Sequence, residues 1–445
     1  APVKTIAEGI ELARDQDATR ILVCNGVYQE QVSLTVDDSG RSLSGGYNCD
    51  SWLYNPDGET LVRPTERGYA LSVSGTTQRV TISNLTFDAM AAVDPGESSI
   101  AAFIVGSSDV RLKQVRLIAH EGVSADDGET HAFSAGAMSE WPSQDALDGH
   151  DGEGHTISSD PTVVSGARQE ATCPGGGISL SGRGGGKPNS PNAELAEPGQ
   201  LPVDKGGTGG VAQGACDSCV SSVCGCTPRT DSNGQPGDPG ADGTGALEYG
   251  VISSDGWTPA SGDPGEIGEP GGGGGGGDGT WQSCAAGGDL GWCGGGGGGA
   301  GGCGGNGGAP GAGGGSSIAL VILDSNVDLT ACDLMVATAG DGSQGDVGQV
   351  GQVGGDGGDG IGGNNGYCVP CDGGGGGEGG TGGNGGGGAG GVSVGVAWAG
   401  DFEPTVDTST VITLGDPGAA GVGGDPGNND GIAGVAQAIL EVTSG

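Results

Sequence analysis

A strict three-residue repeat of glycine between Gly342 and Gly366 limits what this chain can fold into. Every third position of the stretch is Gly, whereas only three of the sixteen positions in between are occupied by Gly. A helix of the polyproline-II type has three residues per turn and no internal hydrogen bonds, so this period places the glycines along one edge. Without side chains on that edge, another extended chain can approach and exchange backbone hydrogen bonds. The repeat therefore predicts bundled glycine helices of the polyglycine-II kind.

The same register recurs in five further stretches of the chain. A collagen triple helix is disfavoured because the chain has only 22 Pro and apolar segments separate the runs. A disordered glycine-rich linker is the competing interpretation. In a bundle, we expect the backbone groups of the interior runs to form hydrogen bonds with neighbouring runs. The outermost runs should keep unpaired N–H and C=O groups. The further runs lie at 234–243, 262–277, 296–314, 373–391 and 415–427.

An apolar repeat outside the glycine runs predicts the rest of the fold. Its pattern is apolar, any, apolar, two of any, apolar, any, apolar, as in Val80, Ile82, Leu85 and Phe87. Each copy follows a short apolar strand, and short strands with tight corners are typical of a parallel β-helix, whose stacked coils share one core. Further copies begin at Val110 and Val327, with a weaker one at Val406; the preceding strands are 70–73, 101–105, 319–323 and 392–398.

The opening residues predict a short helix over 5–13 and then a buried strand at 21–24. The segments PVKTIAEGIELA and ILVCNGVYQE, followed by Gly45-Gly46-Tyr47-Asn48 with Trp52, resemble secreted pectin-lyase-like right-handed β-helix proteins. In that family a short helix caps the first coil. The later coils separated by glycine repeats resemble large glycine-rich surface proteins of bacteria. Both resemblances concern the fold and not an activity.

The predicted fold class is therefore all-β. We expect a right-handed parallel β-helix with a short N-terminal capping helix and polyglycine-II insertions. The first coils should occupy 1–122, and an irregular acidic and His-containing insert with Cys- and Gly-rich insertions should occupy 123–316. Later coils with glycine helices should occupy 317–445, ending in a strand at 434–442.

The charge of the chain restricts its partners. It has 15 Lys and Arg against 56 Asp and Glu, a net charge of −41. After Arg229 there is no Lys, Arg or His, so this half cannot hold nucleic acid or another polyanion. There is no run of about 18 apolar residues, so we expect no transmembrane helix.

The thirteen Cys predict disulfides and an extracellular or cell-surface location. The odd count leaves one thiol free or paired with another molecule. The chain begins at Ala1, for which cleavage of a secretory signal is one explanation. Disulfides are favoured over a zinc knot at 216–226 and over a redox pair at 368–371, and Cys24 is expected to pair with Cys49. The candidate disulfide residues are Cys24, Cys49, Cys216, Cys219, Cys224, Cys226, Cys284, Cys293, Cys368 and Cys371.

One window combines His with carboxylates. Asp148, His150, Asp151, Glu153 and His155 could together hold a divalent metal, although composition favours a solvated polar loop. The stretch 354–362 also fits a single calcium-binding nonapeptide, but such motifs work in tandem. No cofactor is firmly predicted, and Ca²⁺ is the candidate ion.

The sequence contains no convincing catalytic set. We therefore expect a non-catalytic extracellular structural protein, either a self-associating fibre or matrix subunit or a surface adhesin. Its expected partners are other copies of itself and a surface polysaccharide. An uncapped C-terminal coil and exposed glycine edges would favour association, which divalent cations should promote by screening. The alternative is a carbohydrate-active β-helix enzyme, a lyase or hydrolase, which needs converging carboxylates around 120–155.

Overall fold

The protein is represented by a computed structural model. It describes residues 2–55, 57–126, 141–152, 165–174, 177–185, 196–208, 231–282, 291–360 and 371–445, without the side chains of 280–282 and 291–293.

The chain begins with the predicted helix, α1 (Ile6–Asp15), which covers the first coil. Its capping box is complete, because Thr5 Oγ1 accepts the N–H of Glu8 and the Glu8 carboxylate accepts the N–H of Thr5. Ile6, Ile10 and Ala13 are buried in the core beneath it. The second helix, α2 (Gln144–Leu147), is a single turn. Neither of these described helices has the length and the apolar run needed to cross a membrane.

The strands stack into a parallel β-helix, as predicted. Three six-stranded parallel sheets form its walls, and successive coils add one strand to each. The first sheet holds β1 (Arg20–Cys24), β4 (Ser42–Tyr47), β7 (Val80–Ser83), β10 (Val110–Lys113), β19 (Val327–Thr330) and β22 (Thr405–Val406). The second holds β2 (Gly26–Tyr28), β5 (Thr60–Val62), β8 (Thr86–Asp88), β11 (Arg116–Ile118), β20 (Asp333–Met335) and β23 (Val411–Thr413). The third holds β3 (Val32–Leu34), β6 (Leu71–Ser74), β9 (Ser99–Val105), β18 (Ser317–Leu323), β21 (Ser393–Ala399) and β24 (Ala436–Glu441).

The apolar repeat sets the register between coils. Val110 pairs with Val80 on one side and with Val327 on the other, and all three side chains are buried. Leu117 is stacked in the same way in the second sheet. The coils before and after the long insertion therefore belong to one β-helix with one core.

In the coils of β7, β10 and β19 the corner between the first and second sheets is tight, whereas the corner between the second and third sheets takes the long insertions. The corner between the first and second sheets turns on a single residue of positive φ, such as Asn84 (55°), Gln114 (50°) or Ala331 (53°). In the second coil the same corner is wider and carries the loop 48–59 between β4 and β5. The corner between the second and third sheets is open instead, and it accommodates 119–316, 336–392 and 414–435.

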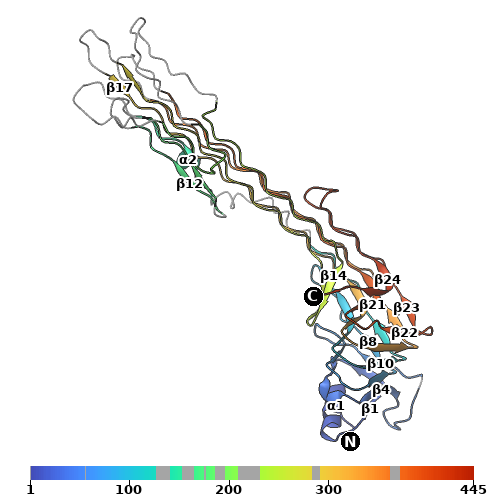
Figure 1. The fold of residues 1–445 in the computed structure, drawn as a ribbon. Helices are drawn as coiled ribbons and strands as arrows, with labels where there is room; N and C mark the ends of the chain where they lie inside the picture. The colour runs from blue at the N-terminus through green and yellow to red at the C-terminus, as the bar shows by residue number, and fades with distance from the viewer. Residues whose placement is uncertain are drawn as a thin grey trace.

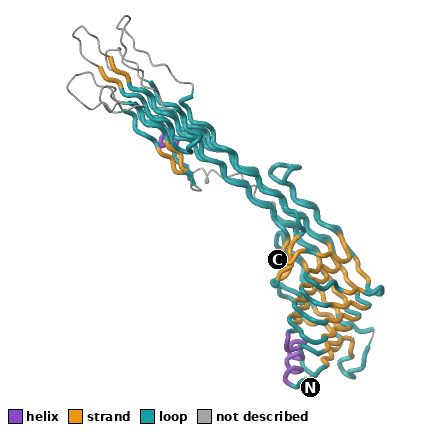
Figure 2. Tube along the Cα trace, in the orientation of Figure 1, coloured by secondary structure: helices purple, strands orange, loops and turns teal. Residues whose placement is uncertain are grey.

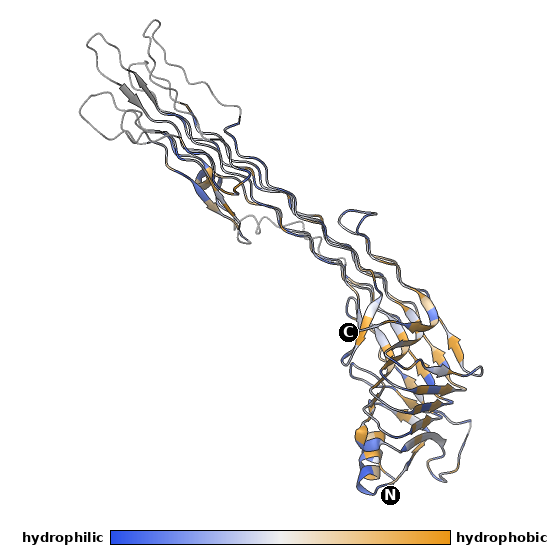
Figure 3. Ribbon diagram, viewed as in Figure 1, coloured by the Kyte–Doolittle hydropathy of each residue, from blue (hydrophilic) through white to orange (hydrophobic). Residues whose placement is uncertain are grey.

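These insertions form a long arm on one side of the β-helix (Figure 1). Figure 2 shows that the arm is almost entirely free of helices and strands in the usual sense, because it consists of extended chains side by side. Hydrophobic residues concentrate in the β-helix instead (Figure 3). Both chain termini lie at the β-helix and not on the arm (Figure 1).

A hairpin at the base of the arm covers the outer face of the third sheet. It consists of β14 (Gly250–Ser253) and β15 (Gly256–Pro259). Trp257 is buried there and donates its indole N–H to Ser316 Oγ at 3.1 Å. The remaining elements are η1 (Val36–Asp38), β12 (Glu170–Thr172), β13 (Ile178–Leu180), β16 (Thr280–Gln282), β17 (Gly291–Cys293) and β25 (Thr443–Ser444).

Candidate functional site: the glycine-helix arm

The glycine runs make hydrogen bonds to their neighbours in steps of three residues, as polyglycine-II helices do. The central helix of the arm is 373–391. Its Gly376, Gly379 and Gly382 donate to 340–360 at 2.8 Å, and each residue that follows one of these donates to 262–277. The predicted bundle of glycine helices is therefore present, and the linker interpretation is wrong for these residues.

The central helix is surrounded on all sides at the base of the arm. It donates hydrogen bonds to three neighbours and accepts them from three others, so each of its six sides is occupied. No side chain is needed to stabilise such a bundle, because the backbone groups of one chain satisfy those of the next. The six neighbouring segments are 234–246, 262–277, 295–314, 340–360, 415–424 and 429–434.

The number of glycines per triplet follows the number of packed sides. A Cβ atom on Gly379 would lie 2.0 Å from the carbonyl oxygen of Cys303, and one on Gly380 would lie 2.0 Å from that of Asp238. Two positions of each central triplet must therefore be Gly. The third position points outward and carries Glu378 or Thr381, which are exposed. Outer helices such as 234–246 need only one Gly per triplet.

Side chains close much of the arm's outer surface. Asn384 Oδ1 accepts the N–H of Gly348 at 3.1 Å, Asp242 Oδ1 accepts that of Asn384, and Asn233 Oδ1 accepts that of Gly375. Gly375 and Asn384 belong to the central helix, so only the bond of Gly348 bears on the outer runs. The expectation that the outermost runs keep unpaired N–H groups is wrong at Gly348, where an amide oxygen accepts the N–H.

Proline closes the surface in a second way. Pro236, Pro239, Pro264 and Pro270 occupy the outward positions of the triplets in 234–246 and 262–277. Proline has no N–H, so these positions offer no donor to a further chain. The sequence contains a signal for this, since each of these prolines is the third residue of a Gly-x-Pro triplet.

The His and Asp window lies on the arm, where two of its carboxylates are structural. Asp148 Oδ1 accepts the N–H of Asp356 at 2.9 Å, and Asp151 Oδ1 accepts that of Asp359 at 2.8 Å. The window thus lies beside 354–360, the described part of the stretch that fits a single calcium-binding nonapeptide. The carbonyl oxygen of His150 accepts the N–H of Gly297.

The metal prediction itself stays a prediction. Glu153 and His155 lie outside the described residues. Within the described part of the chain, no group of three or more His, Cys, Asp or Glu is arranged to hold a metal ion.

The described cysteines confirm part of the disulfide prediction. Cys24 is bonded to Cys49, and Cys371 is disulfide-bonded. A second bridge, Cys173–Cys303, was not predicted; it fixes the β12–β13 hairpin to helix 295–314. Its two residues are far apart in sequence, and only the packing of the bundle brings them together. The predicted residues Cys216, Cys219, Cys224, Cys226, Cys284 and Cys368 lie outside the described residues, as does the side chain of Cys293.

Cys332 is the one free thiol among the described residues. It occupies an inward position of the apolar repeat and is buried in the β-helix core. Burial raises the pKa of this thiol. It therefore packs as a small apolar side chain and is not poised to react.

A buried lysine joins a further segment to the arm. Lys205 Nζ lies 2.8 Å from Asp238 Oδ2 and 3.0 Å from Glu269 Oε2, on two adjacent glycine helices. Burial alone would lower the pKa of Lys205, but the hydrogen bonds to these two carboxylates outweigh it and leave the pKa raised. The lysine therefore remains charged and stabilises the packing of 196–208 on the arm.

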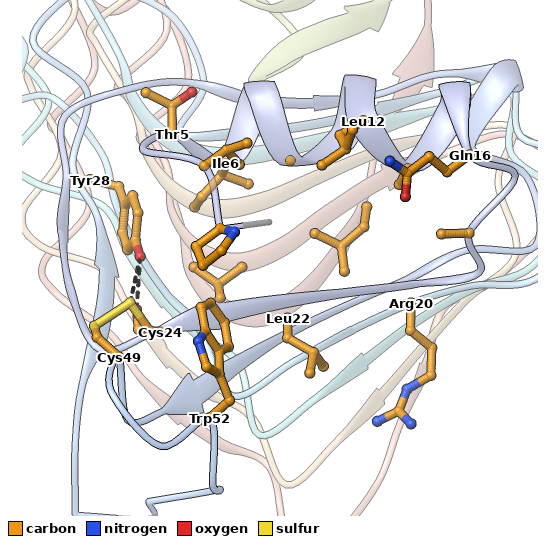
Figure 4. Close-up of a pocket in the computed structure, with 17 residues that line it drawn as sticks. Thr5, Ile6, Leu12, Gln16, Arg20, Leu22, Cys24, Tyr28, Cys49 and Trp52 are labelled. Carbon is orange, nitrogen blue, oxygen red and sulfur yellow. Dashed lines mark hydrogen bonds between the residues drawn. A yellow bond between two sulfur atoms is a disulfide. The ribbon is translucent and has the colours of Figure 1, made fainter.

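A groove of about 530 Å³ lies between α1 and β1 at the N-terminal end of the β-helix (Figure 4). Leu12, Leu22 and Trp52 line it, and Arg20 is the one charged residue in its wall. Tyr28 lies at its end, beside the Cys24–Cys49 bridge, and donates to the carbonyl oxygen of Cys24. A groove of this composition offers no pair of carboxylates for acid–base chemistry.

His120 lies in an ion-pair cluster on the side of the β-helix. Its Nε2 is 2.8 Å from Asp88 Oδ1, and Arg63 Nε donates to the other oxygen of the same buried carboxylate at 2.6 Å. The cluster joins three successive coils. His131 lies outside the described residues.

Comparisons of this chain with protein-family models, with curated proteins and with solved structures found no match.

Proposed function

We propose that this is an extracellular, non-catalytic structural protein in which the glycine-helix bundle is a rigid arm. The arm holds its far end away from the β-helix. The observation that carries the proposal is the central helix, whose backbone groups are bonded along its length to neighbouring chains of the arm, with all six sides occupied at the base. At about 3.1 Å per residue, this helix alone extends about 56 Å.

Of the two structural roles, presentation of the far end fits the arm better than lateral assembly into a fibre. Asp, Asn and Pro close many of the outer edges along which further glycine helices could pair. The net charge of −41 also opposes close packing of arms. The far end is thus the natural place for contact with a partner, as in a surface adhesin.

The described disulfides support an extracellular location, because such bonds persist in oxidising compartments. We also propose that the protein is related to the pectin-lyase-like β-helix class and to glycine-rich surface proteins. The stacked parallel sheets are consistent with both relationships. A surface polysaccharide is the partner we propose for the far end.

Blocking each end of the molecule with a bulky group tests the proposal. Asp359→Cys places a thiol near the far end, and Val27→Cys places one on the first coil; both original side chains are exposed. A large polyethylene glycol maleimide is attached to each variant, and binding to a panel of acidic and neutral polysaccharides and to whole cells is measured. The buried Cys332 should not react.

We expect the group at position 359 to abolish binding and the group at position 27 to leave it unchanged. The opposite result would refute presentation by the arm. The enzyme alternative has its own readout in the same experiment, since polysaccharide chains shortened on incubation with the unmodified protein would favour a lyase or hydrolase.

A further inference from the structure

A groove lies where a loop of the second coil meets the corners of the next two coils. The loop 48–59 joins β4 to β5, and Asn84 and Gln114 turn the corners of the two coils that follow. The groove has a volume of about 390 Å³. It lies between the first and second sheets, and therefore not at the corner that carries the arm. Tyr54, Asp57, Glu59 and Arg116 also line it.

The loop that forms one wall of the groove is held in a fixed position. The disulfide between Cys24 and Cys49 joins its first residues to β1. Further along the loop, Tyr54 pairs with Tyr47 in an antiparallel bridge, and the two rings meet edge to face with their centroids 6.0 Å apart. A wall that is already ordered loses little conformational entropy when a ligand binds.

Tyr54 presents an aromatic surface in this wall. Its ring lies so close to Gly46 that a Cβ atom on Gly46 would be 2.9 Å from Cε2 of the ring. Its hydroxyl donates to Asn84 Oδ1 at 3.2 Å, which restricts the orientation of the ring. Half of the residue nevertheless remains exposed (50%). Tyr54 is therefore a positioned ring with an open apolar surface.

Polar groups with unused hydrogen-bonding capacity line the same groove. Gln114 is exposed, and its side chain has no hydrogen-bond partner among the described residues. Glu59 Oε1 accepts the hydroxyl of Thr86 at 3.1 Å, and its second oxygen remains for a ligand. The amide of Asn84 keeps its N–H donors, because its bond to Tyr54 uses only the oxygen. The groove thus offers both donors and acceptors.

We infer that this groove binds a short neutral oligosaccharide. A sugar ring has apolar C–H faces, which fit the ring of Tyr54, and hydroxyl groups that both donate and accept hydrogen bonds, as the groove requires. Tyr54, Asn84 and Gln114 belong to three successive coils, which extend about 10 Å at the usual spacing between strands. The groove is therefore long enough for more than one sugar ring.

The charge of the groove restricts which sugars fit. Asp57 and Glu59 are exposed carboxylates. Arg116 does not offset them, because it pairs with Asp333, whose Oδ2 lies 3.1 Å from Arg116 Nε. A sugar that carries a carboxylate is therefore repelled. A purely apolar ligand is disfavoured as well, since it would leave the polar groups of the groove without partners.

Saturation-transfer NMR of the full chain with cellotriose, mannotriose and trigalacturonic acid tests the inference. We expect transfer to at least one of the two neutral sugars and none to the acidic one. In titrations, Tyr54→Ala should weaken the binding at least about tenfold, because the aromatic surface is lost. Gln114→Ala should weaken it about threefold or more through lost hydrogen bonds. This variant should fold normally, since Ala331 turns the same corner of the next coil with a φ of 53°.

Two further variants serve as controls. Phe402→Ala removes another half-exposed aromatic side chain (52%) outside the groove and should leave the affinity unchanged. Tyr54→Phe keeps the ring and should retain binding. No transfer to either neutral sugar, unchanged affinity in Tyr54→Ala or Gln114→Ala, an equal loss in Phe402→Ala, loss of binding in Tyr54→Phe, or equal binding of trigalacturonic acid would each overturn the inference.

The groove goes beyond the proposed function and does not depend on the arm. A single groove of this size binds a short sugar weakly, so it does not retain a polysaccharide or a cell by itself. With the bulky group attached at position 359, short neutral sugars should still bind to the groove, whereas polysaccharides should no longer bind to the far end. Loss of one kind of binding without the other shows which of the two proposals fails.

Discussion

At Gly379, one hydrogen atom in place of a methyl group decides whether two chains can lie side by side. A Cβ there would lie 2.0 Å from a backbone oxygen that cannot move away. We predict that Gly379→Ala destabilises the arm by about 1–3 kcal/mol, as overpacking does elsewhere. The matched variant Glu378→Ala changes an exposed outward position and should stay within about 0.5 kcal/mol. Thermal unfolding followed by circular dichroism measures both; equal effects would contradict the packing argument.

Polar side chains on the arm can accept hydrogen bonds from the backbone of a neighbouring chain, and Asp148 is an example. Because its Oδ1 accepts the N–H of Asp356, Asp148→Asn keeps an acceptor, whereas Asp148→Ala loses it. We predict that the Asn variant is as stable as the parent and that the Ala variant loses about 1 kcal/mol. Thermal melts with and without added Ca²⁺ provide the check. A Ca²⁺-dependent gain in stability that the Asn variant loses would instead support the predicted metal site.

Asp38 should make stability depend on pH. Burial alone would raise the pKa of Asp38, but its hydrogen bonds with Arg14 and with the N–H of Thr35 outweigh burial and lower it. A lowered folded-state pKa contributes stability above the unfolded value of about 3.9, and this is lost as pH falls through the folded value. Asp38→Asn should thus cost about 1.5–3 kcal/mol at neutral pH and progressively less below about pH 4. Denaturant titrations at both pH values test this; a constant difference would contradict it.

At the scale of elements, helices of the arm differ in how many of their N–H groups are bonded. Within the described residues, nearly every N–H of 373–391 has a partner, whereas in 234–246 mainly every third one does. We predict slower amide exchange in the central helix than in the outer one, because exchange requires an opening that breaks more bonds. Hydrogen exchange with mass spectrometry measures this, and similar rates in the two segments would argue against the bundle. Replacement of both Cys173 and Cys303 by Ser, which leaves the Cys24–Cys49 bridge intact, should speed exchange in β12–β13 and leave the coils unchanged.

Helices and strands could be predicted where a periodic sequence pattern corresponds to one backbone conformation. The repeat at Val80 and Val110 gave the coils, because inward positions must be apolar in every coil. The glycine period gave the helices for the same reason. Doubled glycines, as in Gly379-Gly380 and Gly301-Gly302, indicate helices that pack on several sides, but they do not distinguish 373–391 from 295–314.

Contacts between elements could not be predicted in the same way. The Cys173–Cys303 bridge depends on which helix lies beside which hairpin, and a period does not specify neighbours. The hydrogen bonds that Asp148 and Asn384 accept from backbone N–H groups likewise depend on which chain lies beside each residue. The sequence offered two interpretations for Asp148, a metal ligand or a residue of a solvated loop, and neither includes a bond to the backbone of a neighbouring chain.

At the scale of the whole molecule, the account depends on the rigidity of the arm. A rigid central helix spans about 56 Å, whereas a flexible glycine-rich chain of the same 373–391 length would span about 24 Å. The two alternatives therefore differ in the overall dimensions of the protein and in the compactness of its parts.

Small-angle X-ray scattering of the intact protein at low salt measures this difference directly. We predict a scattering curve that matches one elongated particle, with a long tail in the distance distribution and a Kratky plot that returns toward the baseline. A Kratky plot that rises steadily, with dimensions of a β-helix carrying flexible loops, would contradict the rigid arm.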